Sequence, residues 1–308
     1  MIILVNAMYS IGVVGVGTIG GNLASRIISE GVSDELLIAS RNMERLKNYS
    51  LDLQDVNACN ERDVKITPCS IEDVVERSDL AVVCARADFE NIAKEDIRMK
   101  GLIPNGLIIR DIAGKFRGYG GNVLMATNPV DVMSRLFYEG ADIEPSKIYG
   151  NGSNLDTARY KAILSEIYCV PVESIFGQVI GEHGDSRVVL YSSTTVNGEN
   201  KKLDKEEIEK NLNERSPIIG RSLGRMRHGA VASIINAIKK IKGDENGIVQ
   251  LSVQYGEAFI GMPLLFDSGS GKVAFPEMDY TETIKFWESK SKLELAYRTF
   301  SEGLRWQT

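Results

Sequence analysis

The 308-residue chain contains two histidines, His183 and His228, so chemistry that needs a side chain titrating near neutral pH has few candidates. His183 lies in the polar turn of IGEHGDS, directly after an apolar stretch. Asp156 and Arg159 lie three residues apart in NLDTARYKAIL. This spacing places both side chains on one face of a helix. The three side chains are therefore candidates for a common site.

Hydride reduction of a 2-oxo acid needs three groups of these kinds. A histidine can deliver a proton to the carbonyl oxygen while hydride arrives at the carbon. A carboxylate can hold that imidazole in one tautomer and stabilise its charged form. An arginine guanidinium can bind the substrate carboxylate through two parallel hydrogen bonds. His183, Asp156 and Arg159 fit these roles in that order, and the alternative is a polar turn beside a surface ion pair without chemistry.

A glycine-rich turn near the N-terminus predicts a dinucleotide site. The stretch SIGVVGVGTIGGNLASRIISEG contains G-x-G-x-x-G after an apolar strand and before an amphipathic helix. The first glycine permits the tight turn, the second lets the backbone approach a pyrophosphate, and the third lets helix and strand pack closely. The alternative is a glycine turn with a structural role only. The residues expected at the cofactor from this motif are Gly15, Gly17, Thr18, Ile19 and Gly20.

The residue that usually selects the dinucleotide is replaced in this chain. Twenty residues past Gly20, where an acid would bind the adenosine ribose, the chain has Ser40 followed by Arg41. An acid there would repel a phosphate on that ribose by ~4 kcal/mol per charge pair at ~4 Å and an effective dielectric near 20. Ser40 removes the repulsion, and Arg41 suits a phosphate, with Asn42 and Arg45 nearby. The sequence therefore predicts a preference for NADP(H), with NAD(H) possible, unless Arg41 is only a solvated residue at a helix start.

The order of apolar and polar stretches predicts an α/β fold. In the first half, short runs rich in Val, Ile and Leu alternate with helix-like stretches, and the first helix is expected to end at Gly31. This pattern is typical of a doubly wound parallel sheet. We predict a Rossmann domain over residues 1–149 and an α/β (α+β) catalytic domain over residues 150–308. The second domain should contain a helix over 154–168, a β-rich stretch, charged helical segments, further strands and a closing amphipathic helix.

Composition and charge argue against several classes of function. The net charge of −6 disfavours nonspecific nucleic-acid binding, which needs a basic surface. No apolar run approaches the ~20 residues of a membrane span, and the N-terminus lacks a signal-peptide pattern. Four cysteines occur without a ligand-like cluster, so we expect free thiols, no metal site and a cytoplasmic protein.

Four stretches together resemble the lactate/malate dehydrogenase family. They are GVGTIGGNLA, ATNPVDVM, GNGSNLDTARYK and IGEHGDS, in the family's order and spacing, and the likeness covers essentially the whole chain. The resemblance implies that fold, a homodimer or homotetramer, and reversible reduction of a 2-oxo acid to the 2-hydroxy acid. It also implies that His183 is the catalytic acid/base, Asp156 its partner and Arg159 the carboxylate clamp. Asn128 would contact the nicotinamide ribose or the substrate.

The chain departs from the family in the lid after the fourth strand, VVCARADFENIAKEDIRMKG. The family's lid carries an arginine that polarises the substrate carbonyl, and alignment of KEDI puts Lys94 in its place. Lysine keeps the charge but loses the planar fork. Arg86, which stands where the family has glycine, or Arg98 could serve instead. The counterparts of the family's substrate-selecting residue are Asp88 and Phe89, and neither is a cation.

The sequence favours an NADP(H)-preferring 2-hydroxyacid dehydrogenase that works mainly as a 2-oxo-acid reductase on a substrate other than lactate or malate. A cation within Met226–His228 could face that substrate, and His228 is expected in the pocket wall or on the surface. One alternative is an ordinary NAD-dependent lactate or malate dehydrogenase with an unusual lid. Another is a nucleotide-binding relative that has lost catalysis and acts as a redox sensor or scaffold.

Overall fold

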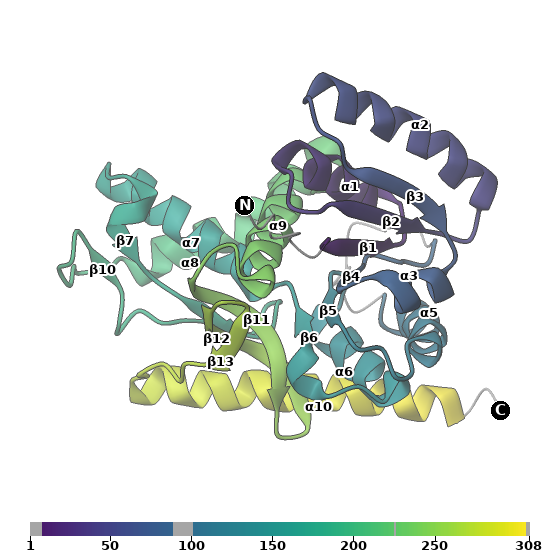
Figure 1. Cartoon of the computed structure of the whole chain (residues 1–308). Coiled ribbons are helices and arrows are strands. Elements are labelled where there is room, and N and C mark those ends of the chain that lie inside the picture. Colours follow the sequence, from purple (N-terminus) through teal and green to yellow (C-terminus); the bar gives the residue numbers. More distant parts are fainter. Residues whose placement is uncertain (1–7, 89–100, 225, 306–308) are drawn as a thin grey trace.

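The first half of the chain forms a parallel sheet whose strands alternate with helices (Figure 1). The computed structural model describes residues 8–88, 101–224 and 226–305. The parallel strands are β1 Ser10–Val14, β2 Glu35–Ala39, β3 Lys65–Cys69, β4 Leu80–Val83, β5 Asn122–Met125 and β6 Ile148–Gly150. They pair in the order β3-β2-β1-β4-β5-β6. This is the strand order of the Rossmann fold, so the predicted fold class is confirmed.

Helices cover both faces of this sheet. They are α1 Thr18–Glu30, α2 Met43–Cys59, α3 Ile71–Arg77, α5 Leu102–Lys115 and α6 Val130–Ala141. Helix α1 contacts α2, while α5 contacts α3 and α6, so two separate helical layers form. Helix α1 ends at Gly31, whose φ of 63° is the left-handed C-cap that the sequence predicts.

The second half extends the same sheet with antiparallel strands. Its elements are α7 Ser153–Tyr168, β7 Ile175–Phe176, β8 Val179–Gly181, β9 Arg187–Val189, β10 Thr195–Val196, α8 Lys205–Leu223, α9 His228–Lys242, β11 Gly247–Tyr255, β12 Ala258–Asp267, β13 Ser270–Val273 and α10 Tyr280–Arg305. Short 3-10 helices cover Pro145–Lys147 and Val172–Ser174. Ser252 of β11 pairs with Gly150 of β6, which joins the two halves. The division into domains at residue 150 stays a prediction.

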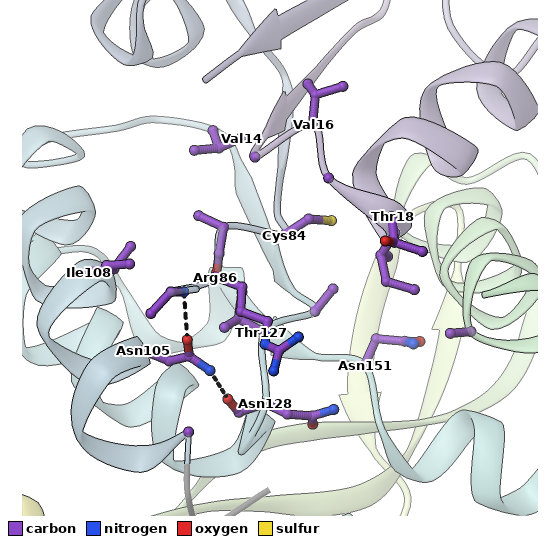
Figure 2. A pocket seen from close by; sticks show the side chains of 18 of the residues that line it. Val14, Val16, Thr18, Cys84, Arg86, Asn105, Ile108, Thr127, Asn128 and Asn151 are labelled. Carbon is purple, nitrogen blue, oxygen red and sulfur yellow. Dashed lines mark hydrogen bonds between the residues drawn. The ribbon is translucent and has the colours of Figure 1, made fainter. Parts of the chain in front are cut away.

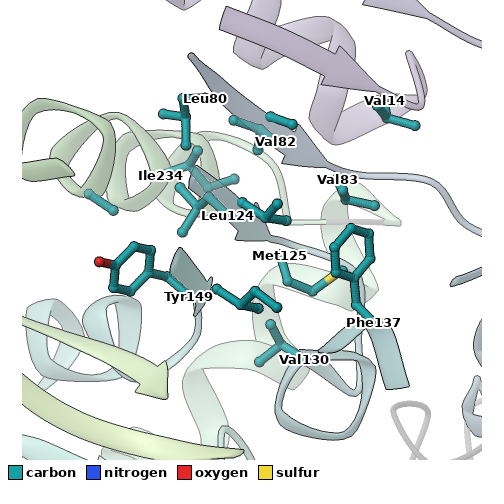
Figure 3. Close-up of a cluster of buried hydrophobic side chains, with 14 of the residues drawn as sticks. Val14, Leu80, Val82, Val83, Leu124, Met125, Val130, Phe137, Tyr149 and Ile234 are labelled. Carbon is teal, nitrogen blue, oxygen red and sulfur yellow. The ribbon is translucent and has the colours of Figure 1, made fainter. Parts of the chain in front are cut away.

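The hydrophobic core crosses the junction between the halves. Figure 3 shows side chains of β1, β4, β5, β6 and α6 in one buried cluster together with Ile234, which comes from α9. Helix α10 runs past both halves in Figure 1 and contacts α5 and α6 as well as β8, β9 and β12. A smaller core lies beneath α8, around Tyr160 and Ile163. The shared core fixes the first half relative to the turn that carries His183. Among the described helices, none is long and apolar enough to cross a membrane.

Candidate active site

A cavity of about 1680 Å³ lies at the carboxyl ends of the parallel strands. The segments that follow β1, β2, β4, β5 and β6 all contribute to its wall, and so does His183 from the second half. Ligands of open α/β sheets bind at this edge because the strand order reverses there. The cavity therefore joins the predicted dinucleotide turn to the predicted catalytic histidine.

The glycines of the turn differ in what surrounds them. Gly15 has a φ of 99°, and a Cβ there would lie 2.5 Å from the backbone nitrogen of Ala85, so a side chain is excluded. A Cβ on Gly17 would meet no atom within 4 Å, because this residue faces the open cavity beside the N-terminus of α1. A Cβ on Gly20 would lie 2.0 Å from the Gly15 carbonyl oxygen. Gly15, Gly17, Thr18 and Ile19 line the cavity, whereas Gly20 packs the helix against the turn. This cradle fits a pyrophosphate.

The end of β2 is open to solvent. Ser40, Arg41 and Arg45 line the cavity there. The Arg41 side chain is 81% exposed, and its Nη2 lies 4.0 Å from Asp88 Oδ2, which is fully exposed. Asn42 does not line the cavity, because its side chain accepts the backbone N–H of Arg45 and caps α2.

The three predicted catalytic side chains lie together in the second half. His183 Nδ1 donates a hydrogen bond to Asp156 Oδ2 over 2.6 Å. Arg159 Nη1 donates to the other oxygen, Asp156 Oδ1, over 3.3 Å. All three side chains are at most 9% exposed. Asp156 and Arg159 share a face of α7, and the turn after β8 brings His183 to them.

These side chains do not all reach the cavity. His183 lines it, but Asp156 and Arg159 lie behind the wall. Met226, which does line the cavity, accepts a hydrogen bond from Arg159 Nη2 at its sulfur over 2.9 Å. Thioether sulfur is a weak acceptor, so a carboxylate could displace it from the guanidinium.

The loop after β4 is held by a residue that sequence reasoning missed. Asn105 of α5 accepts the Ala87 N–H over 2.9 Å and donates to the Asn128 carbonyl over 2.8 Å (Figure 2). Thr127 Oγ1 donates to the Ala85 carbonyl over 2.7 Å. These bonds fix the backbone on both sides of Arg86, which lines the cavity together with Asn128 (Figure 2). The polar residue in the first turn of α5 was the only signal for Asn105.

Only some of the residues expected to face the substrate can be placed. Lys94, Arg98 and Phe89 lie outside the described residues. Arg86 lies in the cavity wall. Among Met226–His228 only Met226 lines the cavity, and His228 is exposed.

Cations from β9 and α8 were not expected from the sequence. Arg187 and Arg221 line the cavity on the wall that carries His183. Arg187 Nη2 donates to Asn213 over 2.6 Å and to Glu209 over 3.3 Å, so its charge is balanced. Cys84 also lines the cavity, and burial raises the pKa of its thiol to about 12, which keeps it protonated.

A second carboxylate reaches His183 and was also missed. Asp131, in the first turn of α6, accepts the backbone N–H of His183 over 2.9 Å. It belongs to the quoted stretch ATNPVDVM, but sequence gave no sign of its contact 52 residues away. Within the described residues, no group of three or more His, Cys, Asp or Glu side chains is placed to hold a metal ion.

Comparison with known proteins gives consistent matches. Residues 9–150 match the family described as lactate/malate dehydrogenase, NAD binding domain. The L-lactate dehydrogenase of Bacillus velezensis is 27% identical over 304 residues, which cover 92% of this chain and 95% of that protein. The L-lactate dehydrogenase of Staphylococcus saprophyticus is 29% identical over 268 residues, with 81% and 83% covered.

Solved structures share the fold over almost the whole chain. The minor L-lactate dehydrogenase of Enterococcus mundtii superposes with a TM-score of 0.87 at 24% identity, covering 96% of this chain and 99% of that one. The malate dehydrogenase of Plasmodium falciparum gives a TM-score of 0.87 at 21% identity, with the same coverage. At these identities the likeness shows the fold alone.

Proposed function

Because the chain belongs to the lactate/malate dehydrogenase family and is a 2-hydroxyacid dehydrogenase, we propose that its reaction takes place in the cavity at His183. The observation that carries this proposal is the 2.6 Å hydrogen bond between His183 and Asp156 in the cavity wall. That bond leaves Nε2 as the ring nitrogen that can exchange a proton with substrate. A bound nicotinamide dinucleotide supplies or accepts the hydride.

The remaining steps belong to the chain's own residues. Arg159 binds the substrate carboxylate once the Met226 sulfur gives up the guanidinium. His183 then donates its Nε2 proton to the carbonyl oxygen during reduction, or accepts the hydroxyl proton during oxidation. Asp156 keeps the imidazole in the required tautomer and stabilises its charged form. For polarising the carbonyl, the candidate within the described residues is Arg86 in the cavity wall, and the other candidates are Lys94 and Arg98.

Two candidates remain for the cofactor. The comparisons favour the alternative of an NAD(H)-linked enzyme, because the matching family is described as an NAD binding domain. A preference for NADP(H), the main expectation from the sequence, is supported by one observation. Ser40, Arg41 and Arg45 line the cavity at the end of β2, and the residue directly after that strand is a serine in place of an acid.

The substrate is a 2-oxo or 2-hydroxy acid, and its side chain is a proposal. The relatives are named L-lactate and malate dehydrogenases, which favours pyruvate or oxaloacetate over the different substrate that the lid sequence suggests. A homodimer or homotetramer also stays a proposal.

One experiment tests these points together. The purified protein is assayed with NADH and NADPH against pyruvate, oxaloacetate and 2-oxo acids with larger side chains. Turnover that is lost in His183→Gln supports the site. Efficient use of pyruvate or oxaloacetate rules out the unusual substrate, and equal or better kcat/KM with NADH rules out the NADP(H) preference. Absence of turnover with every pair, despite dinucleotide binding, refutes the proposal in favour of a binding protein.

A further inference from the structure

His183 is held at two points by two different carboxyl groups. Asp156 of α7 binds its imidazole, as described above. Asp131 of α6 binds its main chain, because Asp131 Oδ2 accepts the His183 N–H over 2.9 Å. The first contact comes from the second half of the chain and the second from the first half. The position of His183 therefore depends on both halves.

Close packing at this contact leaves little freedom. A Cβ on Gly152 would lie 2.5 Å from His183 Cβ and 2.9 Å from Val130 Cγ1. Gly152 therefore lies between the first turn of α6 and the His183 turn, where there is room for backbone atoms but not for a side chain. A displacement of the α6 N-terminus would be transmitted to His183 rather than absorbed.

The carboxyl group of Asp131 is costly to bury at this place. Asp131 is 2% exposed, and its Oδ1 has no hydrogen-bond partner among the described residues. Burial raises the pKa of Asp131 to about 7 against the hydrogen bond from the His183 N–H, and the Glu182 and Asp156 carboxylates add to the rise. An apolar side chain would avoid this cost. What an apolar side chain lacks is the acceptor for the His183 N–H.

We propose that Asp131 is a positioning residue for proton transfer, which fixes the His183 main chain so that the imidazole keeps its bond to Asp156 while it faces the substrate. The inference rests on the proposed function of His183. It assigns Asp131 no contact with substrate or cofactor. What Asp131 supplies is one hydrogen-bond acceptor at a fixed place.

Three variants separate this role from a merely structural one. Asp131→Asn keeps an acceptor oxygen at the same reach, whereas Asp131→Ala removes it. Ser134→Ala is the matched control, because Ser134 is equally buried on α6 and its hydroxyl donates to the Val130 carbonyl, away from His183. We expect Asp131→Ala to lower kcat about 10- to 100-fold, the cost of a misplaced catalytic group, with the dinucleotide KM within about threefold. Asp131→Asn should keep at least about a third of kcat, and Ser134→Ala should match the wild type.

A second readout does not depend on turnover. The chain has only two histidines, so the ring Nδ1–H resonance of His183 is assigned in NMR spectra by comparison with His228→Gln. The short bond to Asp156 should place this resonance far downfield in the wild type, Asp131→Asn and Ser134→Ala. It should be lost or shifted upfield in Asp131→Ala. If that variant does not fold, Asp131→Ser replaces it, because its side chain is too short to reach the His183 N–H.

The outcomes distinguish two kinds of failure. An acceptor-deleted variant with wild-type kcat and an unchanged His183 resonance overturns the role of Asp131. Equal loss in Asp131→Asn and in the acceptor-deleted variant overturns it too, because the acceptor would then not be what matters. Wild-type protein without turnover on any 2-oxo acid overturns the proposed function, while the resonance still reports whether Asp131 positions His183.

Discussion

The two ends of the cavity are built in contrasting ways. At the catalytic end, His183, Asp156 and Arg159 are at most 9% exposed and joined by hydrogen bonds of 2.6 and 3.3 Å. At the end of β2, the Arg41 side chain is 81% exposed and reaches a fully exposed carboxylate at 4.0 Å. The side chains at the first end are buried and held in a fixed geometry, whereas the charge at the second end lies in solvent. Substitutions should therefore have large effects at the first end and graded, salt-dependent effects at the second.

The largest effect is expected at His183 itself. His183→Gln removes the group that we propose exchanges a proton with the substrate oxygen, and such a group typically contributes 10²- to 10⁴-fold to rate. We expect kcat to fall by about that factor, measured by steady-state turnover with saturating dinucleotide. His228→Gln is the matched control, because His228 is exposed and does not line the cavity. Similar losses in both variants would contradict the assignment.

Arg159→Lys should have the next largest effect. The substitution keeps the positive charge but removes the planar fork that binds a carboxylate through two bonds. We expect kcat/KM for the 2-oxo acid to fall by about 10- to 150-fold, the value of one charged hydrogen bond. Dinucleotide affinity, measured by fluorescence titration, should stay unchanged, because Arg159 lies behind the cavity wall. An equal loss of dinucleotide affinity would show that the variant disturbs the cavity as a whole.

A smaller effect concerns stability at the catalytic end. Burial raises the pKa of Asp131 from its ordinary value near 4 to about 7. The stability that this group contributes is therefore full below about pH 4 and is lost as the pH rises through 7. A rise of about three pKa units corresponds to a loss of about 4 kcal/mol. Asp131→Asn lacks this titration, so it should gain stability relative to the wild type between pH 5 and 8 in urea unfolding. A difference that does not change with pH would refute the raised pKa.

The contrast between the ends also explains what the sequence could predict. The short apolar runs of the first half became β1–β5 because Val, Ile and Leu without polar alternation suit strands covered on both faces. The pairing of Asp156 with Arg159 follows from helical spacing alone. Asn42, which the sequence placed near a phosphate, caps α2 through its side-chain oxygen, a contact that the sequence interpretation did not include. The N-cap preference of an Asn that directly precedes a helix accounts for this contact.

Contacts between distant segments could not be predicted. Asn105 bridges Ala87 and Asn128 only because α5 packs beside the ends of β4 and β5. Asp131 meets His183 because the two halves share a core. Neither contact follows from a periodic pattern or a fixed residue spacing in the sequence. Asn105 holds the loop after β4 and Asp131 holds the His183 main chain, and in both cases tertiary packing sets the geometry.

The smallest effect is expected at the solvent-exposed end. Ser40→Asp puts an acid where an adenosine 2′-phosphate would lie, and solvent screening reduces the full repulsion of about 4 kcal/mol. We expect the ratio of kcat/KM for NADPH over NADH to fall by about 10-fold at low salt and by less at 0.5 M salt, because exposed charges are screened. Arg41→Ala should lower the same ratio less, since the Arg41 side chain is 81% exposed and solvent screens its attraction to a phosphate. A ratio that neither substitution moves would mean that the end of β2 does not select the dinucleotide, and that cofactor choice lies elsewhere in the cavity.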